Sequence, residues 1–390
     1  MIHTRLHHIV PIVLLAFCVP TVGSAQKVLR NIVVYEEAGQ YMAWPSIVRT
    51  GPKELVVFFC RSEEHLGPDG AILSVRSTDN GTRWLLPGLV ADTPLDDREC
   101  GVTVLSDGRL LLHLWSTSFT QASYDALPPE SYEAEVLRRW KVHVVSKRYR
   151  EAAGLQGAWG RLSTDGGRSW SDRMAATDAV HGGVHLRDGS LLCASYRTFR
   201  DSIGVFSLAR LPGTWKRRSI IPPPARDSIA FGEPHMLQLR SGRIVMMIRA
   251  TAKPYNDMDP RCVLWETYSD DGGRTWIQPY PTPLWGFPPH LLLLSDGRVL
   301  CTYGYRRPPF GQRACISDDG IHWDPRNEVI LRSDAPNGDI GYPASVELAP
   351  DTILTVYYQP NVPPRTFQRM KPPDPRRTKP AILGTVWSTH

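Results

Sequence analysis

Glutamate, arginine, histidine and tyrosine residues recur at the two ends of six hairpin-like segments in this chain of 390 residues. In each segment an apolar strand, a tight turn and a second apolar strand follow one another. The first strands begin at Ala43-Trp44-Pro45, Asp97-Arg98-Glu99, His181-Gly182-Gly183, Glu233-Pro234-His235, Pro288-Pro289-His290 and Gly341-Tyr342-Pro343. The second strands end at 61–65, His113-Leu114-Trp115, Tyr196-Arg197, Arg249, Tyr305-Arg306-Arg307 and Tyr357-Tyr358. Histidine and glutamate transfer protons and arginine binds carboxylates, so this set predicts a binding or active site.

The turns of these segments carry the signals of β-hairpins. Asp107-Gly108, Asp188-Gly189 and Asp296-Gly297 are examples, since glycine accepts the positive φ that such turns need. Successive turns lie about 55 residues apart, except for one longer gap that holds an insertion at about 120–160. The repeat predicts an all-β fold, a six-bladed β-propeller of four-stranded antiparallel blades. The starts of the innermost strands then meet at one end of the axis.

Two further segments complete the predicted domain, which spans 26–390. Residues 131–150 of the insertion are rich in Glu, Arg and Lys and predict either a helix or, from their valines, two long strands. We expect a surface excursion, a lid or a dimer contact there. The strand at 27–35 is expected to pair with 381–387, which would close the ring and hide its free edges.

Histidines occupy matching places in these repeats. His235 and His290 each precede the turn glycine by the same distance, His181 lies close to the corresponding place, and His65 can overhang the same face. They are expected either to pack and hydrogen bond between strand ends, or to act on substrate as general acids and bases. Converging imidazoles can also hold a divalent metal, but we predict no metal or other cofactor.

The N-terminus predicts export. A basic stretch precedes an apolar run over 9–22, and Gly23-Ser24-Ala25 resembles a cleavage site, so residues 1–25 are read as a signal peptide of a secreted or periplasmic protein. A lipid anchor on Cys18 is disfavoured because bulky Phe17 precedes it. No other stretch is long enough to span a membrane. The net charge of +6 is modest and its basic residues are scattered, which argues against nucleic-acid binding.

Six cysteines follow the predicted signal peptide, without any Cys-x-x-Cys pair. Cys60, Cys193 and Cys301 lie in apolar strands and are expected to be buried thiols. The predicted compartment permits one or two disulfides, which the sequence does not assign.

A second phrase, Ser-x-Asp-x-Gly-x-(Thr/Ser)-Trp, occurs at 77–84, 163–170 and 269–276, with a shorter copy at 317–323 and a relic near 207–215. Its aspartate can bind nearby backbone N–H groups in a turn while its tryptophan anchors a hairpin. The phrase resembles the Asp-box, or BNR repeat, of the sialidase (neuraminidase) superfamily. In that family the box lies far from the active site, so we assign it no catalytic role.

The resemblance extends over nearly the whole chain and implies an exo-glycosidase that removes terminal sialic acid. Family members hold the sugar carboxylate with three arginines, attack with a tyrosine activated by a glutamate, and use an aspartate as acid/base. A neutral tyrosine suits an anionic substrate, which would repel a carboxylate nucleophile. The resemblance makes Tyr342 the nucleophile and Glu233 its partner. It also makes Arg249 the second clamp arginine and Arg313 the third, with Arg306 as a rival.

The sequence departs from the family at two places. The first clamp arginine belongs to an Arg-Ile-Pro phrase that here reads Ala43-Trp44-Pro45, so Arg61, at the exit of the first hairpin, or Arg98 would have to supply the charge. Asp69 is the nearest match to the aspartate that serves as acid/base in the family. The remaining candidates in its loop are Glu63, Glu64 and His65, and a simple turn explains Asp69 as well.

Three functions fit these residues. The first is a glycosidase of sialidase type that releases sialic acid or a related acidic sugar from a glycan. The second is a propeller hydrolase or lyase that acts on polysaccharides containing uronic acid, which the missing clamp arginine and the histidines favour. The third is a carbohydrate-binding propeller without turnover. Its stacking residues would be Trp44, Trp115, Trp285 and Phe310.

Overall fold

The structure is a computed structural model that describes residues 26–390 except 66, 119–131, 226–227, 257 and 363–378. The predicted signal peptide lies outside the described residues. Blades one to three are formed by β2 (Tyr41–Arg49), β3 (Leu55–Ser62), β4 (Ala71–Ser77) and β5 (Gly88–Ala91); β6 (Asp96–Val104), β7 (Leu110–Thr117) and β8 (Gly157–Ser163); and β9 (Val184–His185), β10 (Leu191–Ser195), β11 (Ile203–Leu208) and β12 (Lys216–Ile221). Blades four to six are formed by β13 (Ile229–Gln238), β14 (Ile244–Ala252), β15 (Val263–Ser269) and β16 (Tyr280–Trp285); β17 (Pro289–Leu293), β18 (Val299–Tyr305), β19 (Gly311–Ser317) and β20 (Val329–Arg332); and β21 (Gly341–Ala349), β22 (Thr352–Pro360), β23 (Pro380–Ser388) and β1 (Lys27–Tyr35).

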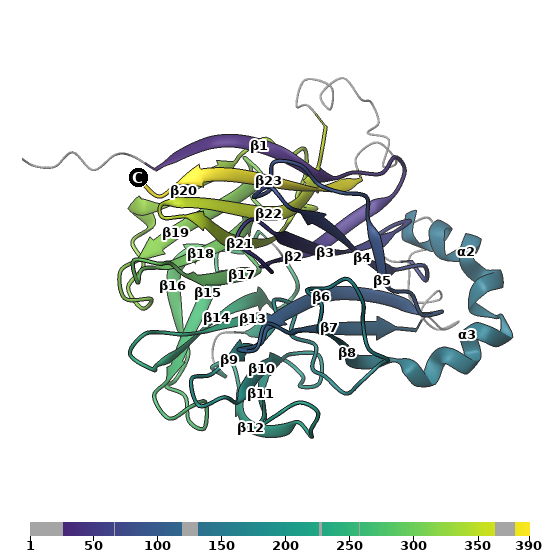
Figure 1. Cartoon of the computed structure of the whole chain (residues 1–390), viewed down its shortest axis with the longest axis horizontal. Coiled ribbons are helices and arrows are strands. Elements are labelled where there is room, and N and C mark those ends of the chain that lie inside the picture. The colour runs from purple at the N-terminus through teal and green to yellow at the C-terminus, as the bar shows by residue number, and fades with distance from the viewer. Residues whose placement is uncertain (1–25, 66, 119–131, 226–227, 257, 363–378) are drawn as a thin grey trace, which may run out of the picture.

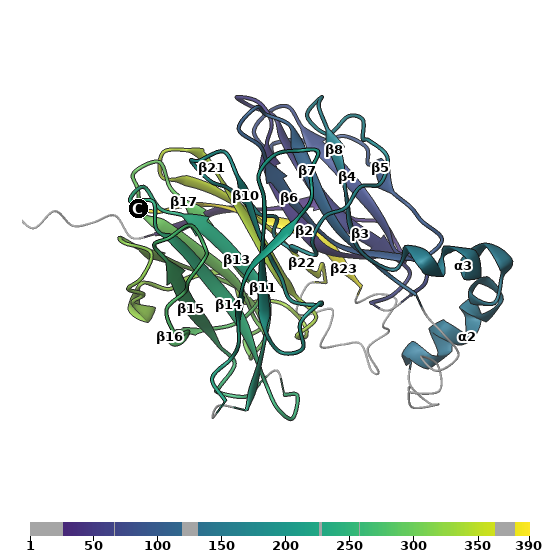
Figure 2. The same ribbon diagram turned by 90° about the horizontal axis from the view of Figure 1, so that it is seen from below.

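The first strands of the six blades form a closed ring. β2, β6, β9, β13, β17 and β21 contact one another in this order, and β21 contacts β2 again. Figure 1 and Figure 2 show the sheets arranged around the resulting axis. Buried side chains fill the space between neighbouring sheets, as Phe58, Leu112 and Leu354 do between blades one, two and six. The predicted six-bladed β-propeller is confirmed.

Blade two departs from the regular pattern. It has three paired strands within the described residues, and a single bridge between Gly160 and Met174 marks the position of a fourth. Blade six is completed by the start of the chain, because β1 pairs antiparallel with β23 (Figure 1). This pairing confirms the predicted closure of the ring, and it covers the outer edge of β23.

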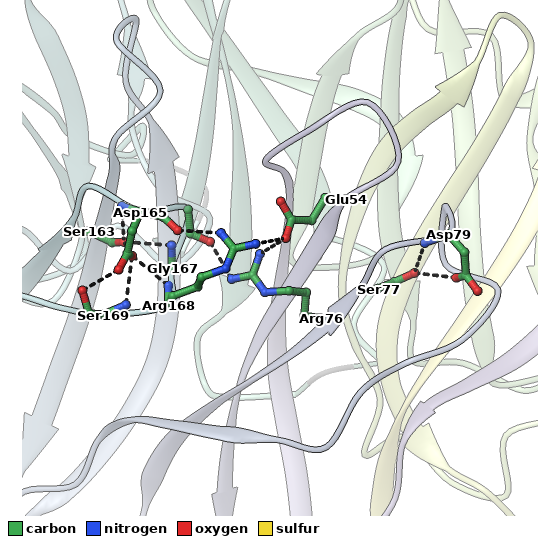
Figure 3. A network of polar contacts seen from close by, with 10 residues as sticks. Glu54, Arg76, Ser77, Asp79, Ser163, Asp165, Gly167, Arg168 and Ser169 are labelled. Carbon is green, nitrogen blue, oxygen red and sulfur yellow. Dashed lines mark hydrogen bonds and ion pairs between the residues drawn. The ribbon is translucent and has the colours of Figure 1, made fainter.

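The Asp-boxes are turns held by their own side chains (Figure 3). Asp165 Oδ1 accepts hydrogen bonds from the backbone N–H groups of Arg168 and Ser169, both at 2.9 Å, and Ser163 Oγ accepts one from Gly167 N at 2.8 Å. The box also joins two blades, because Arg168 of blade two and Arg76 of blade one both bind Glu54 Oε1, at 2.6 and 2.7 Å. The boxes therefore stabilise the rim of the propeller.

The insertion is helical. α2 (Tyr132–Val144) and α3 (Lys147–Ala152) project from one side of the ring (Figure 2), and a short 3₁₀ turn follows at Ala153–Leu155. Ser146 caps α3 by accepting a hydrogen bond from Tyr149 N at 3.2 Å. The alternative of two long strands is wrong, because the valines that suggested it do not alternate between two faces of a sheet but lie at the end of α2. Residues 119–131 of the insertion lie outside the described residues.

The six cysteines that the structure describes are free and buried, which confirms the buried thiols predicted at Cys60, Cys193 and Cys301. None of the described helices is both long and apolar enough to cross a bilayer. A second 3₁₀ turn, Pro325–Asn327, precedes β20.

Stability should depend on pH through Glu266, which lies in β15 and accepts a hydrogen bond from the Trp323 indole at 2.9 Å. Burial raises the pKa of Glu266 to about 8. The folded state therefore holds a proton that the unfolded chain releases at lower pH, so the free energy of unfolding falls as pH rises from about 4.5 to about 8. At pH 8 the free energy of unfolding of the neutral Glu266→Gln variant should exceed that of wild type by of order a few kcal/mol. At pH 4.5 the two proteins should be equally stable. Denaturant unfolding of both proteins at the two pH values tests this, and an equal difference at both values would contradict it.

Candidate functional site

Four inner strands begin with the same backbone feature. Trp44, Glu99, Glu233 and Tyr342 all have positive φ, between 42° and 53°. The pairing of each inner strand with its neighbour shifts register at these residues. A bulge of this kind re-aims a side chain, and it costs of order 1–3 kcal/mol at a residue other than glycine. The four residues come from four blades, and the other three each contact or act on Tyr342, so their side chains meet at one end of the axis.

Tyr342 and Glu233 meet across the ring. The Tyr342 hydroxyl donates a hydrogen bond to Glu233 Oε1 at 2.6 Å, although 109 residues separate the two. Arg249, at the end of the same hairpin as Glu233, donates to both carboxylate oxygens at 2.9 and 2.8 Å. All three side chains lie at the axial ends of blades four and six, as the sequence predicts from their strand positions. The arrangement places a phenol against a carboxylate that an arginine also binds.

The environment of Tyr342 keeps its proton on the phenol. Burial, followed by the negative charges of Glu233 and Glu99, raises the pKa of Tyr342 well above 10. Tyr342 therefore carries a neutral phenol and not a phenolate. Glu233 is instead placed to take the proton while the phenol oxygen forms a new bond, which is general-base assistance.

Arg306 lies beside Arg249, and Arg313 lies elsewhere. The guanidinium groups of Arg249 and Arg306 lie 4.4 and 5.1 Å from the centre of the Phe287 ring. Arg306 also donates to the Ile340 carbonyl and the Tyr358 hydroxyl, at 2.9 and 3.2 Å, next to the start of β21. Arg313 binds within blade five instead, to the Arg332 carbonyl at 2.6 Å and to Glu328 at 3.3 Å. Of the two rival arginines, Arg306 is the one that the structure places with Tyr342.

The acidic side chains of the loop after β3 are engaged in holding it. Asp69 Oδ2 accepts a hydrogen bond from Glu63 N at 2.8 Å, its Oδ1 is buried, and burial raises its pKa. Glu63 binds Arg139 and Trp140 of α2 at 2.6 and 2.8 Å. Glu64 is buried and pairs with Lys379 at 2.6 Å. The insertion therefore positions this loop through Glu63.

His65 differs from these acidic neighbours. Its side chain is 49% exposed, and its ring lies edge-on to Trp44 and Tyr41, with ring centres 5.4 Å apart in both pairs. The Trp44 ring in turn lies 6.4 Å from the Tyr342 ring. His65 therefore stands at the edge of the site.

The place of the family's first clamp arginine holds no charge. Ala43 is fully buried opposite Cys60, and the Trp44 ring lies beside it with the Arg98 guanidinium 4.5 Å from its centre. Arg98 pairs with Asp96 at 3.3 Å and donates to the His65 carbonyl at 2.6 Å. Burial nevertheless raises the pKa of Asp96 to about 8.

Arg61 is the remaining arginine for which the sequence predicts substrate contact. It acts electrostatically on Tyr35, in blade six, and on Asp69, in its own loop. The contacts of Arg98 connect it to Trp44 and His65. Of these two arginines, Arg98 is therefore the one that lies with the residues at the axis.

The sequence prediction missed a second acidic cluster. Glu99 accepts a hydrogen bond from the Tyr196 hydroxyl at 2.8 Å and pairs with Arg197. The charge of Glu99 acts on Tyr342, so the two clusters are neighbours. The signal was present, because Glu99 begins its strand at the position that Glu233 holds in blade four, and Tyr196-Arg197 ends the next hairpin.

Three histidines lie deeper along the axis. The rings of His235 and His290 stack with centres 4.6 Å apart, and the centre of His181 is 5.5 Å from each and 6.0 Å from Tyr342. Burial lowers the pKa of His235 to about 3 and those of His181 and His290 well below 6.5. They are neutral at physiological pH and form an uncharged floor beneath Tyr342. Within the described part of the chain, no cluster of histidine, cysteine or carboxylate side chains could hold a metal ion.

Comparisons with solved structures agree with this architecture. A protein of unknown function from Dyadobacter fermentans is 22% identical, with a TM-score of 0.70 over 93% of this chain and 99% of the other. The NanB sialidase of Streptococcus pneumoniae is 11% identical, with a TM-score of 0.63 over 91% and 70%. A leech intramolecular trans-sialidase is 12% identical, with a TM-score of 0.58 over 94% and 70%. At these identities the likeness shows the fold alone.

Comparison at the level of sequence identifies the family. No curated protein matches the chain. The model of the BNR repeat-like domain matches residues 135–355, which is more than half of the chain. The chain therefore belongs to the BNR repeat-like family. It shares its six-bladed propeller with solved sialidases.

Proposed function

We propose that this protein is a glycoside hydrolase of sialidase type that releases a terminal acidic sugar, sialic acid or a relative, from a glycan. The observation that carries the proposal is the 2.6 Å hydrogen bond from the Tyr342 hydroxyl to Glu233. A buried phenol paired with a carboxylate is the nucleophile and base that the reaction needs. Residues 1–25 are proposed to direct the protein out of the cytoplasm.

In the proposed reaction the Tyr342 oxygen attacks the anomeric carbon while the bond to the leaving-group oxygen breaks. Glu233 takes the phenol proton, and an acid on the opposite side protonates the leaving group. Water then attacks the anomeric carbon and gives a proton to the conjugate base of that acid, and Tyr342 leaves and recovers its proton from Glu233. A neutral nucleophile avoids the repulsion that a carboxylate would meet from the carboxylate of the sugar.

Arg249 and Arg306 are proposed to bind that sugar carboxylate. Both guanidinium groups lie over Phe287, next to Tyr342, and a planar guanidinium can offer a carboxylate two parallel N–H donors. Arg249 also binds Glu233, so the same side chain connects the substrate charge with the base. With Ala43 in place of the first clamp arginine, the carboxylate would be held by two guanidinium groups.

The replacement by Ala43 also supports a second candidate, cleavage of a polysaccharide at a uronic acid. The two candidates differ in their products. Hydrolysis at a terminal sialic acid releases the saturated monosaccharide, whereas elimination at a uronic acid leaves an unsaturated sugar that absorbs ultraviolet light. Incubation with a panel of both glycan types, followed by identification of the released sugar, decides between them. A third outcome, binding without any product, would indicate a carbohydrate-binding propeller.

The Tyr342→Phe variant should lose turnover by about 10³-fold or more, because the residue that forms the covalent bond is missing. Its melting temperature should stay close to that of wild type. The matched control is Tyr357→Phe, which removes a buried hydroxyl bound to Thr385 at 2.8 Å within blade six. This control should keep kcat/KM within a few fold. Undiminished release of the monosaccharide by Tyr342→Phe would rule out the mechanism.

Arg306 and Arg313 can be separated by substitution with glutamine. Arg306→Gln should raise KM for the acidic sugar at least about 10-fold, because a charge-assisted hydrogen bond to the carboxylate is lost. Arg313→Gln should instead lower the melting temperature, since it removes the ion pair with Glu328, and should change KM less. Steady-state kinetics and thermal unfolding of both variants test the assignment. The reverse pattern of KM values would return the clamp role to Arg313.

A further inference from the structure

The identity of the acid that protonates the leaving group follows from the side chains around the loop after β3. Glu63, Glu64 and Asp69 are each bound to a neighbouring group, as described above. Carboxylates tied to Arg139, Lys379 and a backbone N–H are poorly placed to approach a glycosidic oxygen. His65 belongs to the same loop, has a half-exposed side chain, and stands next to Trp44 at the edge of the site.

His65 is bound through one ring nitrogen, to Tyr41. The Tyr41 hydroxyl lies 2.6 Å from His65 Nδ1 and donates to Asp339 Oδ1 at 2.8 Å, and His65 Nδ1 is 3.6 Å from the same carboxylate oxygen. The remaining charged groups nearby are Arg98, which donates to the His65 carbonyl, and Arg306, whose charge acts on Asp339. Tyr41 belongs to blade one, Arg98 to blade two and Arg306 to blade five, and Asp339 precedes the first strand of blade six. His65 is therefore fixed relative to the ring and not only to its own loop.

The protons in this chain of contacts can be assigned. Burial opposes the charge of Asp339, but the nearby His65 and the hydrogen bond from Tyr41 keep its pKa below the usual value, so its carboxylate acts only as an acceptor. Burial raises the pKa of Tyr41 well above 10, so Tyr41 keeps its single proton and donates it in a hydrogen bond to Asp339. The Tyr41 oxygen must then accept from His65, which makes Nδ1 the protonated nitrogen of the neutral ring. Nε2 is left as the atom that gains and loses a proton.

We propose that His65 is the general acid and base of this enzyme, positioned by Tyr41 and Asp339, in place of the aspartate that the sequence resemblance assigns to Asp69. The proposal rests on the proposed glycosidase function. As the Tyr342 oxygen bonds to the anomeric carbon, protonated Nε2 gives its proton to the departing glycosidic oxygen, and Glu233 takes the phenol proton. In the second step neutral Nε2 takes a proton from the attacking water, and Glu233 returns its proton to Tyr342. Histidine suits both steps because its ordinary pKa lies near neutrality.

Two glycosides of the same sugar with different leaving groups can show whether His65 is a general acid or only a structural residue. An aryl glycoside has a leaving group that departs without protonation, and a glycoside of lactose does not. His65→Asn should lose about 10²-fold in kcat/KM on the lactose glycoside and only a few fold on the aryl glycoside. Wild type should show an alkaline fall of kcat/KM on the lactose glycoside that His65→Asn lacks. His322→Asn is the matched control, since His322 is also an exposed histidine paired with an aspartate, but in the Asp-box of blade five.

The same pair of substrates tests Asp69, the rival candidate for the general acid. Asp69→Asn should affect both substrates equally, in proportion to any loss of stability. If Asp69→Asn shows the leaving-group dependence and His65→Asn does not, the assignment to His65 is overturned. If wild type releases sugar from neither substrate, the proposed function itself fails and the role of His65 with it. Full activity of Tyr342→Phe would overturn only the assignment of the nucleophile.

An observation that needs no turnover tests the positioning residues. The ¹⁵N shifts of the neutral His65 ring, measured by NMR, should show that Nδ1 carries the proton. Tyr41→Phe should abolish this preference, because the oxygen that accepts from Nδ1 is removed. A neutral ring protonated at Nε2 in wild type would contradict the arrangement even if the glycosidase activity were established.

Discussion

The contact between Tyr342 and Glu233 depends on a closed ring, because the two residues belong to blades four and six. Blade six is complete only when β1, from the start of the chain, pairs with β23 at its end. The reacting groups are therefore set by the relative position of whole sheets and not by a local turn. The Asp-boxes and ion pairs such as Glu54 with Arg76 and Arg168 fix the rim, and rigid blades keep the axial ends in register.

Much of this organisation could be predicted from the sequence. Hairpin turns and Asp-boxes are local signals with a regular spacing, so the number of blades and the positions of Tyr342, Glu233 and Arg249 follow from counting along strands. Arg306 and Arg313 could not be separated in this way, because each lies at a strand end of blade five and only the packing on Phe287 distinguishes them. The role of Asp339 was missed, because it precedes its strand and reaches Tyr41 across 298 residues. Loop residues are positioned by partners distant in sequence, and periodicity carries no information about those partners.

The charged side chains at the axis form ion pairs, and a bound substrate would have to contact these pairs. Glu233 is matched by Arg249 and Glu99 by Arg197. An anionic sugar placed over Tyr342 would therefore meet guanidinium groups already bound to carboxylates, which weakens the field that each can offer. The neutral histidine floor adds no positive charge. Affinity for an acidic sugar then depends on the geometry of Arg249 and Arg306 more than on net charge.

The helical insertion has a physical role in this scheme. A catalytic acid in a loop is effective only if the loop holds it within hydrogen-bonding reach of the leaving group. Here α2 binds the loop through Arg139 and Trp140, which both contact Glu63, and the adjacent residue Glu64 is tied to Lys379. Because Glu63 and Glu64 immediately precede His65, these contacts limit the movement of the backbone that carries the imidazole. Glu63 and Glu64 could be acids by their residue type, but here they hold the loop in place. An acidic loop can therefore present a histidine to the site.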